Sequence, residues 1–215
     1  MRTNTGLLRV AIVAALFVTA CLTMGGCELA YLLAGNGSNA AQYKLSKKMR
    51  ILVLVDTSAD SQLSVHSMAT LMTSVNQILY AHKCANNFVP AYRIVALQRQ
   101  NPVQYHSMGI ADIAHAVNAG VVVYIFVKRF DVTLESAGQL TKGSADALVK
   151  VVDANGNRLW PMTGSPGQSV TARVATGTAV SQSPHEVQSA MLAILARRIS
   201  RLFYRYAVGY MPKSQ

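Results

Sequence analysis

The hydrophobic residues of this chain follow two spacings, one typical of strands and one typical of helices. Continuous apolar runs at 51–55 and 121–127 predict strands that are buried on both faces. Apolar residues that recur every three or four positions predict long helices over about 61–82 and 184–206. The first of these helices would be capped by Asp60 or Ser61.

Shorter segments complete the plan. We expect a strand at 93–97, a helix at 110–117, and further strands at 145–152 and 170–178. Helices alternate with strands only in the first half, so the sheet should be mixed. The pattern therefore predicts one α/β (α+β) domain, with a sheet of four to six strands packed by about three helices. The two strongest strands should be adjacent and central, covered by the two long helices.

The N-terminal segment has the pattern of an export signal. Arg2 and Arg9 precede an uncharged apolar run over 10–23, and no carboxylate accompanies them. Small residues, Gly25 and Gly26, then stand directly before Cys27. This arrangement resembles a bacterial lipoprotein signal. The resemblance implies cleavage before Cys27 and attachment of a diacylglycerol, with acyl chains such as palmitate, to its thiol.

Two other interpretations of this segment remain open. Val18-Thr19-Ala20 before Cys21 also fits the lipoprotein pattern, and Met24 is an unusual residue at its place before Cys27. The uncharged stretch 10–27 could also stay as an uncleaved anchor, because about 17–25 apolar residues span a bilayer. We favour Cys27 because the apolar run ends there.

This reading predicts three parts. Residues 1–26 are the signal peptide, 27–49 a lipid-anchored flexible tether rich in small polar residues, and 50–210 the envelope domain. The expected location is the cell envelope, on a membrane facing the periplasm, most simply the outer membrane. The expected partners are that membrane, through the covalent lipid, and an envelope protein or anionic material of the cell wall or lipid surface.

The charge balance agrees with such partners. The chain has a formal net charge of +11, and loss of Arg2 and Arg9 with the signal leaves 18 of its 20 basic residues against 9 acidic ones. An exported basic chain meets anionic headgroups or cell-wall carboxylates, so we do not expect nucleic acid as a partner. Removal of Cys21 and acylation of Cys27 would leave Cys84 unpaired, and we expect it to be a small buried residue at a helix end.

Candidate chemistry is sparse. Asp56, Ser58 and Asp60 follow a buried strand and resemble the Asp-x-Ser-x-Ser metal loop of von Willebrand A-type adhesion domains, with Asp60 in place of the last serine. That resemblance implies a divalent-cation-dependent adhesion domain, although the other cation-binding residues of that family have no match here. The alternative is a helix cap with a local turn.

No motif of a catalytic or cofactor site is evident, so we predict no enzyme and no cofactor. His106, Asp112 and His115 are interpreted as surface residues. In the last predicted helix, Arg197, Arg201 and Arg205 follow one another at intervals of four and should form a basic stripe. This stripe is either an interaction surface or is neutralised by carboxylates from elsewhere in the fold.

The hairpin at 151–160 carries a family resemblance. Asp153, Gly156 and Trp160 have the D-x-x-G-x-x-x-W spacing of exported assembly lipoproteins, and Ala119-Gly120 before the 121–127 strand has the reversed order of their GA-x-x-V strand. That group includes the periplasmic domain of the curli-secretion lipoprotein, lipoprotein activators of penicillin-binding proteins and the N-terminal domain of the Tol propeller protein. The resemblance implies a non-catalytic binding or assembly module.

Overall fold

The computed structural model describes residues 38–59, 61, 63–134, 141–162, 164–174 and 183–207. These residues belong to two units. In the smaller one, β1 (Ser38–Asn39) pairs antiparallel with β7 (Tyr206–Ala207), and the Asn39 amide donates to the Tyr206 hydroxyl at 2.9 Å. The larger unit, Ala40–Arg205, contains every other described helix and strand.

A mixed five-stranded sheet forms the centre of the larger unit. Its order is β2-β3-β4-β5, and β6 also pairs with β4. Only β2 and β3 run parallel to each other, while the other described pairs are antiparallel. The predicted α+β domain with a mixed sheet is therefore confirmed. The strands are β2 (Ile51–Thr57), β3 (Val121–Leu134), β4 (Thr141–Asp153), β5 (Arg158–Trp160) and β6 (Gln168–Val174).

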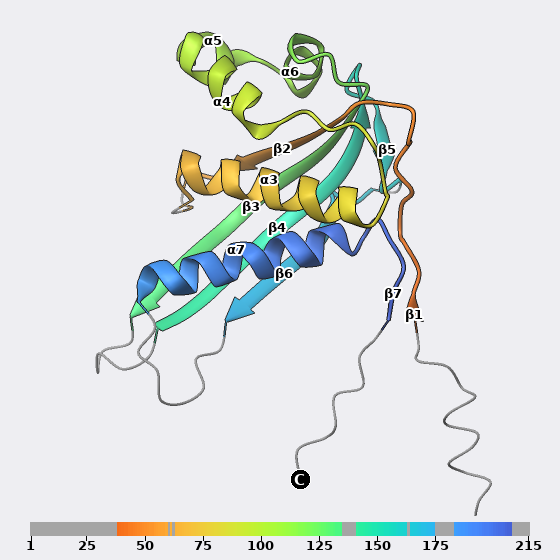
Figure 1. The fold of residues 1–215 in the computed structure, drawn as a ribbon. Coiled ribbons are helices and arrows are strands. Elements are labelled where there is room, and N and C mark those ends of the chain that lie inside the picture. Colours follow the sequence, from red (N-terminus) through yellow and green to blue (C-terminus); the bar gives the residue numbers. More distant parts are fainter. Residues whose placement is uncertain are drawn as a thin grey trace, which may run out of the picture. The chain divides into compact units, whose positions relative to one another are not determined.

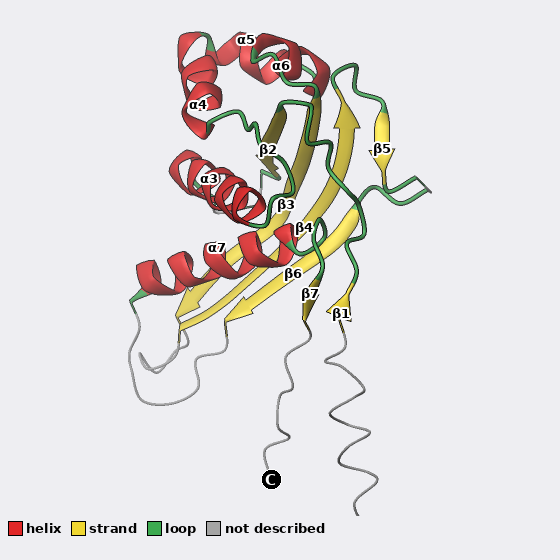
Figure 2. Ribbon diagram, turned by 45° about the vertical axis from the view of Figure 1, so that its right-hand side comes forward, coloured by secondary structure: helices red, strands yellow, loops and turns green. Residues whose placement is uncertain are grey.

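Two long helices, α3 (Val65–Ala81) and α7 (Pro184–Ser200), lie side by side on one face of this sheet (Figures 1 and 2). Alternate residues of the strands point at them, which is why every second position of β4 from Ala145 to Val151 is buried and the positions between are only half-buried. The core of α7 consists of fully buried apolar residues on its inward side: Val187, Met191, Leu195, Ala196 and Ile199.

The connection between β2 and β3 contains three further helices: α4 (Ala91–Gln100), α5 (Pro102–Ser107) and α6 (Ile110–Ala116). The strand expected at 93–97 is wrong, because this segment is the middle of α4. Its apolar run is too short to distinguish a strand from a buried helix, and Ala91 and Ile94, three positions apart, are the two buried residues of α4. The expected helix at 110–117 is confirmed.

The two strongest strands are adjacent, as predicted, but the central position expected for both is right only for β3. β2 stands at the edge of the sheet. It is nevertheless not exposed, because Ile51–Val55 are at most 5% accessible. The residues after α3 close off its start, where the Ile51 N–H donates to the Asn87 carbonyl at 2.9 Å and the Val89 N–H to the Ile51 carbonyl at 2.8 Å. A continuous apolar run indicates burial on both faces, but it does not distinguish a central strand from a covered edge.

Several boundaries differ from those expected. The cap of α3 is Ser64, whose hydroxyl accepts from the Ser67 N–H, and not Asp60 or Ser61. The last helix ends at Ser200 instead of continuing to 206. Residues 40–49, which we assigned to the tether, belong to the larger unit, since Leu45 is buried and the N–H groups of Gln42 and Tyr43 donate to the Leu202 carbonyl.

Candidate functional site

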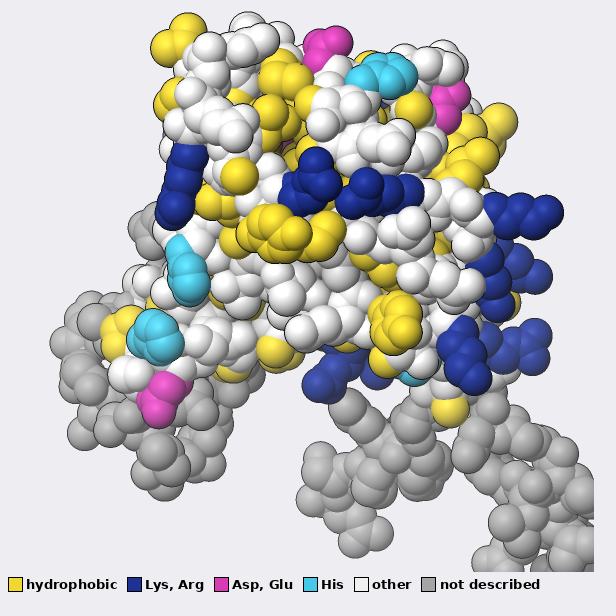
Figure 3. All heavy atoms as spheres, turned by 45° about the horizontal axis from the view of Figure 1, so that its top comes forward, with side chains coloured by type: hydrophobic (Ala, Val, Ile, Leu, Met, Phe, Trp, Pro, Cys, Tyr) yellow, Lys and Arg dark blue, Asp and Glu magenta, His cyan; other side chains and the backbone are white. Residues whose placement is uncertain are grey.

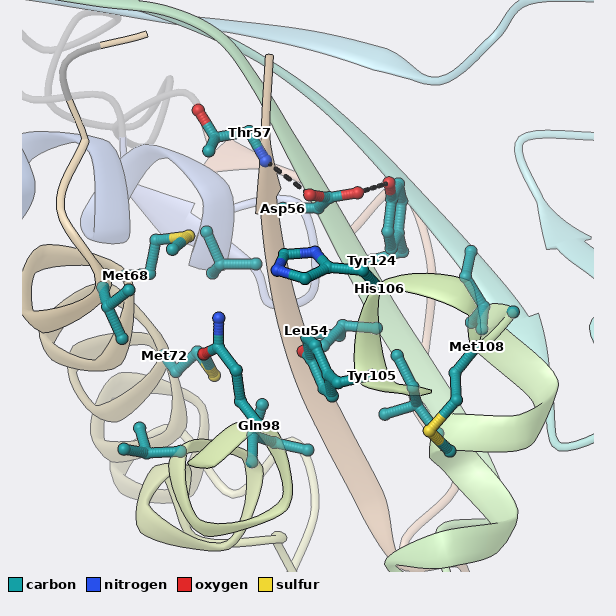
Figure 4. Close-up of a pocket in the computed structure, with 17 residues that line it drawn as sticks. Leu54, Asp56, Thr57, Met68, Met72, Gln98, Tyr105, His106, Met108 and Tyr124 are labelled. Carbon is teal, nitrogen blue, oxygen red and sulfur yellow. Dashed lines mark hydrogen bonds between the residues drawn. The ribbon is translucent and has the colours of Figure 1, made fainter. Parts of the chain in front are cut away.

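A pocket of about 470 Å³ opens at the carboxyl end of β2. Strand ends of this kind are where open α/β sheets place ligands, because the connecting segments diverge there and leave space. The walls come from β2 and β3 and from all four helices that join them (Figure 4). Polar and apolar groups share the lining, and its apolar residues include Leu54, Val55, Met68, Met72, Ile94, Met108 and Ile113.

Asp56 brings a carboxylate to this pocket. The Tyr124 hydroxyl donates to its Oδ2 at 2.7 Å, and the Thr57 N–H donates to its Oδ1 at 2.8 Å (Figure 4). Tyr124 is two positions before the residue that pairs with Asp56 in the parallel register, so both side chains point to the same face of the sheet. The two hydrogen bonds orient the carboxylate in advance of any ligand.

The two tyrosines of the pocket are held in their neutral form. Burial, the hydrogen bond to Asp56 and the negative charge of Asp56 raise the pKa of Tyr124. Burial and the same carboxylate raise the pKa of Tyr105. Both phenols therefore remain hydrogen-bond donors at neutral pH. The Lys150 ammonium lies over the Tyr124 ring, 4.7 Å from the ring centroid, and burial lowers the pKa of this lysine.

Gln98 and Tyr105 bring two polar side chains to the pocket that can still form hydrogen bonds. Both line it, and neither forms a side-chain hydrogen bond with the described part of the chain. His106 also lines the pocket, with its ring edge-on to Tyr105 at 6.1 Å between centroids. The pocket thus offers an amide and a phenol beside an oriented carboxylate, above an apolar floor.

The loop after β2 places the residues of the predicted cation site as follows. The Asp56 carboxylate accepts hydrogen bonds from Tyr124 and Thr57, and the Ser58 hydroxyl donates to the Lys128 carbonyl at 2.7 Å. Asp60 lies outside the described residues. Within the part of the chain that the structure describes, no three His, Cys, Asp or Glu side chains gather as they would around a metal ion. The cation-dependent adhesion domain stays a prediction.

The arginines expected to form one stripe are divided by the end of α7. Arg197 is on the helix and exposed, Arg201 is its C-cap residue, and Arg205 lies beyond it. A regular i, i+4, i+8 stripe is therefore wrong. The three residues remain close together, because Arg197 and Arg201 both act electrostatically on Tyr204, and Arg205 is its neighbour in the chain.

Further lysines adjoin these arginines. Lys47 is close enough to Cys84 to influence its thiol, and the Cys84 Sγ donates to the Phe203 carbonyl at 3.7 Å. His82 stacks on Tyr204 at 3.6 Å between ring centroids. Figure 3 shows lysine and arginine side chains gathered along one side of the molecule. We define the basic surface as the cationic residues of the segments that meet at residues 202–204: Lys44, Lys47, Lys48, Lys83, Arg197, Arg201 and Arg205.

The other residues that the sequence suggested as a cluster do not lie together in one site. Of His106, Asp112 and His115, only His106 lines the pocket; Asp112 accepts from the Gly109 N–H at 2.9 Å at the start of α6, and His115 is exposed. Cys84 is buried after the end of α3, as expected. Cys21 and Cys27 lie outside the described residues.

Sequence reasoning missed Gln98, Tyr105 and Tyr124 as residues of this pocket. Tyr124 carried one usable signal, since it is the hydroxyl-bearing residue inside the apolar run 121–127. Gln98 carried none, because the segment of α4 was taken for a strand, and Tyr105 carried none, because it lies in α5, where no element was predicted.

The comparisons with known proteins give similarity of structure only. The sequence matches no family model and no curated protein. The structure is similar to lipoprotein GNA1162 from Neisseria meningitidis, at 18% identity over 69% of this chain and 98% of that one, with a TM-score of 0.45. It is also similar to the hypothetical protein CT253 from Chlamydia trachomatis (16% identity, 70% and 92% covered, TM-score 0.43). A minor lipoprotein from Acinetobacter baumannii is similar too (13%, 70% and 89%, 0.37).

Bacterial lipoproteins are thus among the solved structures that this chain is similar to. Because each TM-score is below 0.5, the likeness carries no argument about the site or its function. Among the helices of the described residues, none has both the length and the apolar character needed to cross a bilayer.

Proposed function

We propose that this chain is a lipid-anchored protein of the bacterial envelope, acylated at Cys27 and facing the periplasm on the outer membrane, that acts by binding and not by catalysis. The observation that carries the proposal is the position of the basic surface. It surrounds Leu202, whose carbonyl accepts from the N–H groups of Gln42 and Tyr43 where the larger unit begins.

The distance along the chain supports this arrangement. Cys27 lies thirteen positions before Ala40. An extended chain covers at most ~3.5 Å per residue, so the start of the unit stays within about 45 Å of the lipid. Cationic side chains at that start are therefore within reach of the headgroups. Each lysine or arginine near an anionic surface contributes ~1 kcal/mol of attraction, which fades within a Debye length of about 10 Å.

Two sequence features support lipidation. The segment before Cys27 has arginines, then an apolar run, then two glycines, and the acidic residues of the chain all come after it. Intact mass of the membrane-extracted protein should show loss of residues 1–26 and a gain of acyl chains. Cys27→Ser should abolish both. If Cys21→Ser abolishes them and Cys27→Ser does not, the acylated residue is Cys21.

Vesicle binding tests the basic surface separately from the lipid. We expect the processed chain without its lipid to bind vesicles of phosphatidylcholine with a quarter phosphatidylglycerol more tightly than vesicles of phosphatidylcholine alone. The double change Lys47→Glu and Arg205→Glu should weaken this binding about tenfold or more at low salt. A matched control, Arg93→Glu with Arg99→Glu, changes the same charge on exposed positions of α4 and should leave it within about twofold.

The control decides the interpretation. Equal loss in the two double variants would mean that net charge alone drives binding, and the basic surface would have no special role. Unchanged thermal unfolding of both variants is expected, because exposed charges contribute little to stability.

A further inference from the structure

The pocket at the carboxyl end of β2 contains a carboxylate that forms no ion pair with the described residues. Among the described residues that line it, Asp56 carries the one carboxylate. Its partners are a phenol and a backbone N–H, both neutral. Within the described chain no lysine or arginine nitrogen forms an ion pair with it, whereas Arg129 pairs with both Asp131 and Asp146. The Asp56 carboxylate is exposed to solvent and therefore accessible to a ligand; among the described acidic residues Asp112, Asp153 and Glu186 also form no ion pair, but only Asp56 lines this pocket.

The surroundings of Asp56 suit an organic cation. A carboxylate oxygen that accepts one hydrogen bond retains capacity for another, so each oxygen of Asp56 can still accept from an ammonium group. The ring of Tyr105 lines the same pocket, and aromatic faces attract cations, as the position of Lys150 over the Tyr124 ring illustrates. Thioethers and aliphatic side chains from α3, α4 and α6 form the rest of the wall and suit an apolar body.

We propose that this pocket binds a small amphipathic organic ammonium compound, with the ammonium group at Asp56 and the apolar body against Met68, Met72 and Ile94. Gln98 and the Tyr105 hydroxyl are free to hydrogen-bond polar substituents of the ligand. The volume of about 470 Å³ is within the range of small-molecule sites, about 300–1,000 Å³. The inference does not depend on the lipid anchor or on the basic surface.

Three soluble compounds of similar size separate charge from shape. They are 2-phenylethylamine, which is an ammonium ion at pH 7, the neutral 2-phenylethanol, and the anionic 3-phenylpropionate. Titration of the full-length protein labelled at its methionine methyl groups reports where each compound binds, because Met68, Met72 and Met108 line the pocket and the other methionines that the structure describes, Met49, Met162 and Met191, do not. We expect the amine to shift these three methyl resonances and to bind about tenfold more tightly than the alcohol. The carboxylate should bind most weakly.

Asp56→Asn should remove the preference for the amine and leave binding of the alcohol unchanged. It keeps the shape of the side chain and an oxygen that accepts from Tyr124. Asp131→Asn on β3 is the matched control, since it removes the same charge from a residue that does not line the pocket, and it should keep the wild-type preference.

Equal affinity of the wild-type protein for amine and alcohol overturns the proposed ligand class, and so does tighter binding of the carboxylate. Absence of shifts at the three pocket methionines with every compound overturns the site itself. Both tests on the wild-type protein stand whether or not the Asp56 variant folds. Neither result bears on acylation or vesicle binding, so failure here is distinct from failure of the proposed function.

Discussion

Replacing Val75 by alanine tests whether the inward side of α3 is part of the domain's core. Val75 lies in the second half of that helix, one turn after Leu71 and one turn before Leu79, and its side chain is 0% accessible. Val103 offers a matched control, because it is also a helical valine, in α5, yet is 83% accessible. The same two methyl groups are removed at both sites, and only their surroundings differ.

The magnitude follows from burial. Removing two methyl groups from a core loses ~0.8 kcal/mol each in transfer free energy, or about 1.6 kcal/mol. The space left behind adds roughly 1 kcal/mol, because close-packed neighbours relax only in part. Alanine is the better helix former and returns about 0.5 kcal/mol. We therefore expect Val75→Ala to lower the free energy of unfolding by about 2 kcal/mol, and Val103→Ala to change it by less than about 0.5 kcal/mol.

Urea unfolding followed by circular dichroism measures both values. The slope with denaturant should stay the same, so that the midpoint alone reports the loss. A difference between the two variants below about 0.5 kcal/mol would refute the assignment of this side of α3 to the core, and with it the packing of α3 beside α7. A changed slope would instead point to an altered denatured or native state.

Three other predictions concern a titration, a helix cap and a close contact. The pKa of Tyr124 is raised in the folded protein, so above about pH 10 the unfolded chain loses its phenolic proton first and the free energy of unfolding falls. Tyr124→Phe should make this fall less steep, by at most ~1.4 kcal/mol per pH unit, when unfolding is measured at pH 9 and 11. Ser183→Ala should cost about 1 kcal/mol of stability, because Ser183 and Glu186 form the capping box of α7, and an unchanged midpoint in urea would argue against that cap. Gly143→Ala should lower the unfolding temperature, because the added methyl carbon would overlap the buried Met191 side chain, and a gain in stability would show that this space is open.

Much of the fold could be predicted because its signals are local. The apolar runs of β2 and β3 and the helical spacing in α3 and α7 follow from burial of each element's own face, so the class of fold and its two strongest strands needed no tertiary information. The failure at 93–97 has the same cause, since a run of four apolar residues satisfies either a strand or a helix.

Sequence alone also marked Asp56 as a residue at the end of a buried strand, and it indicated an exported, strongly basic chain. Tertiary structure decided what Asp56 faces. Tyr124 reaches it only because β2 and β3 pair in parallel, and Gln98, Tyr105 and His106 reach the same pocket only because the long β2–β3 connection folds into α4, α5 and α6. The basic surface likewise joins Lys47, Lys83 and Arg197 from three distant segments. A pocket or a surface depends on distances between segments, and local spacing along the chain carries no record of those distances.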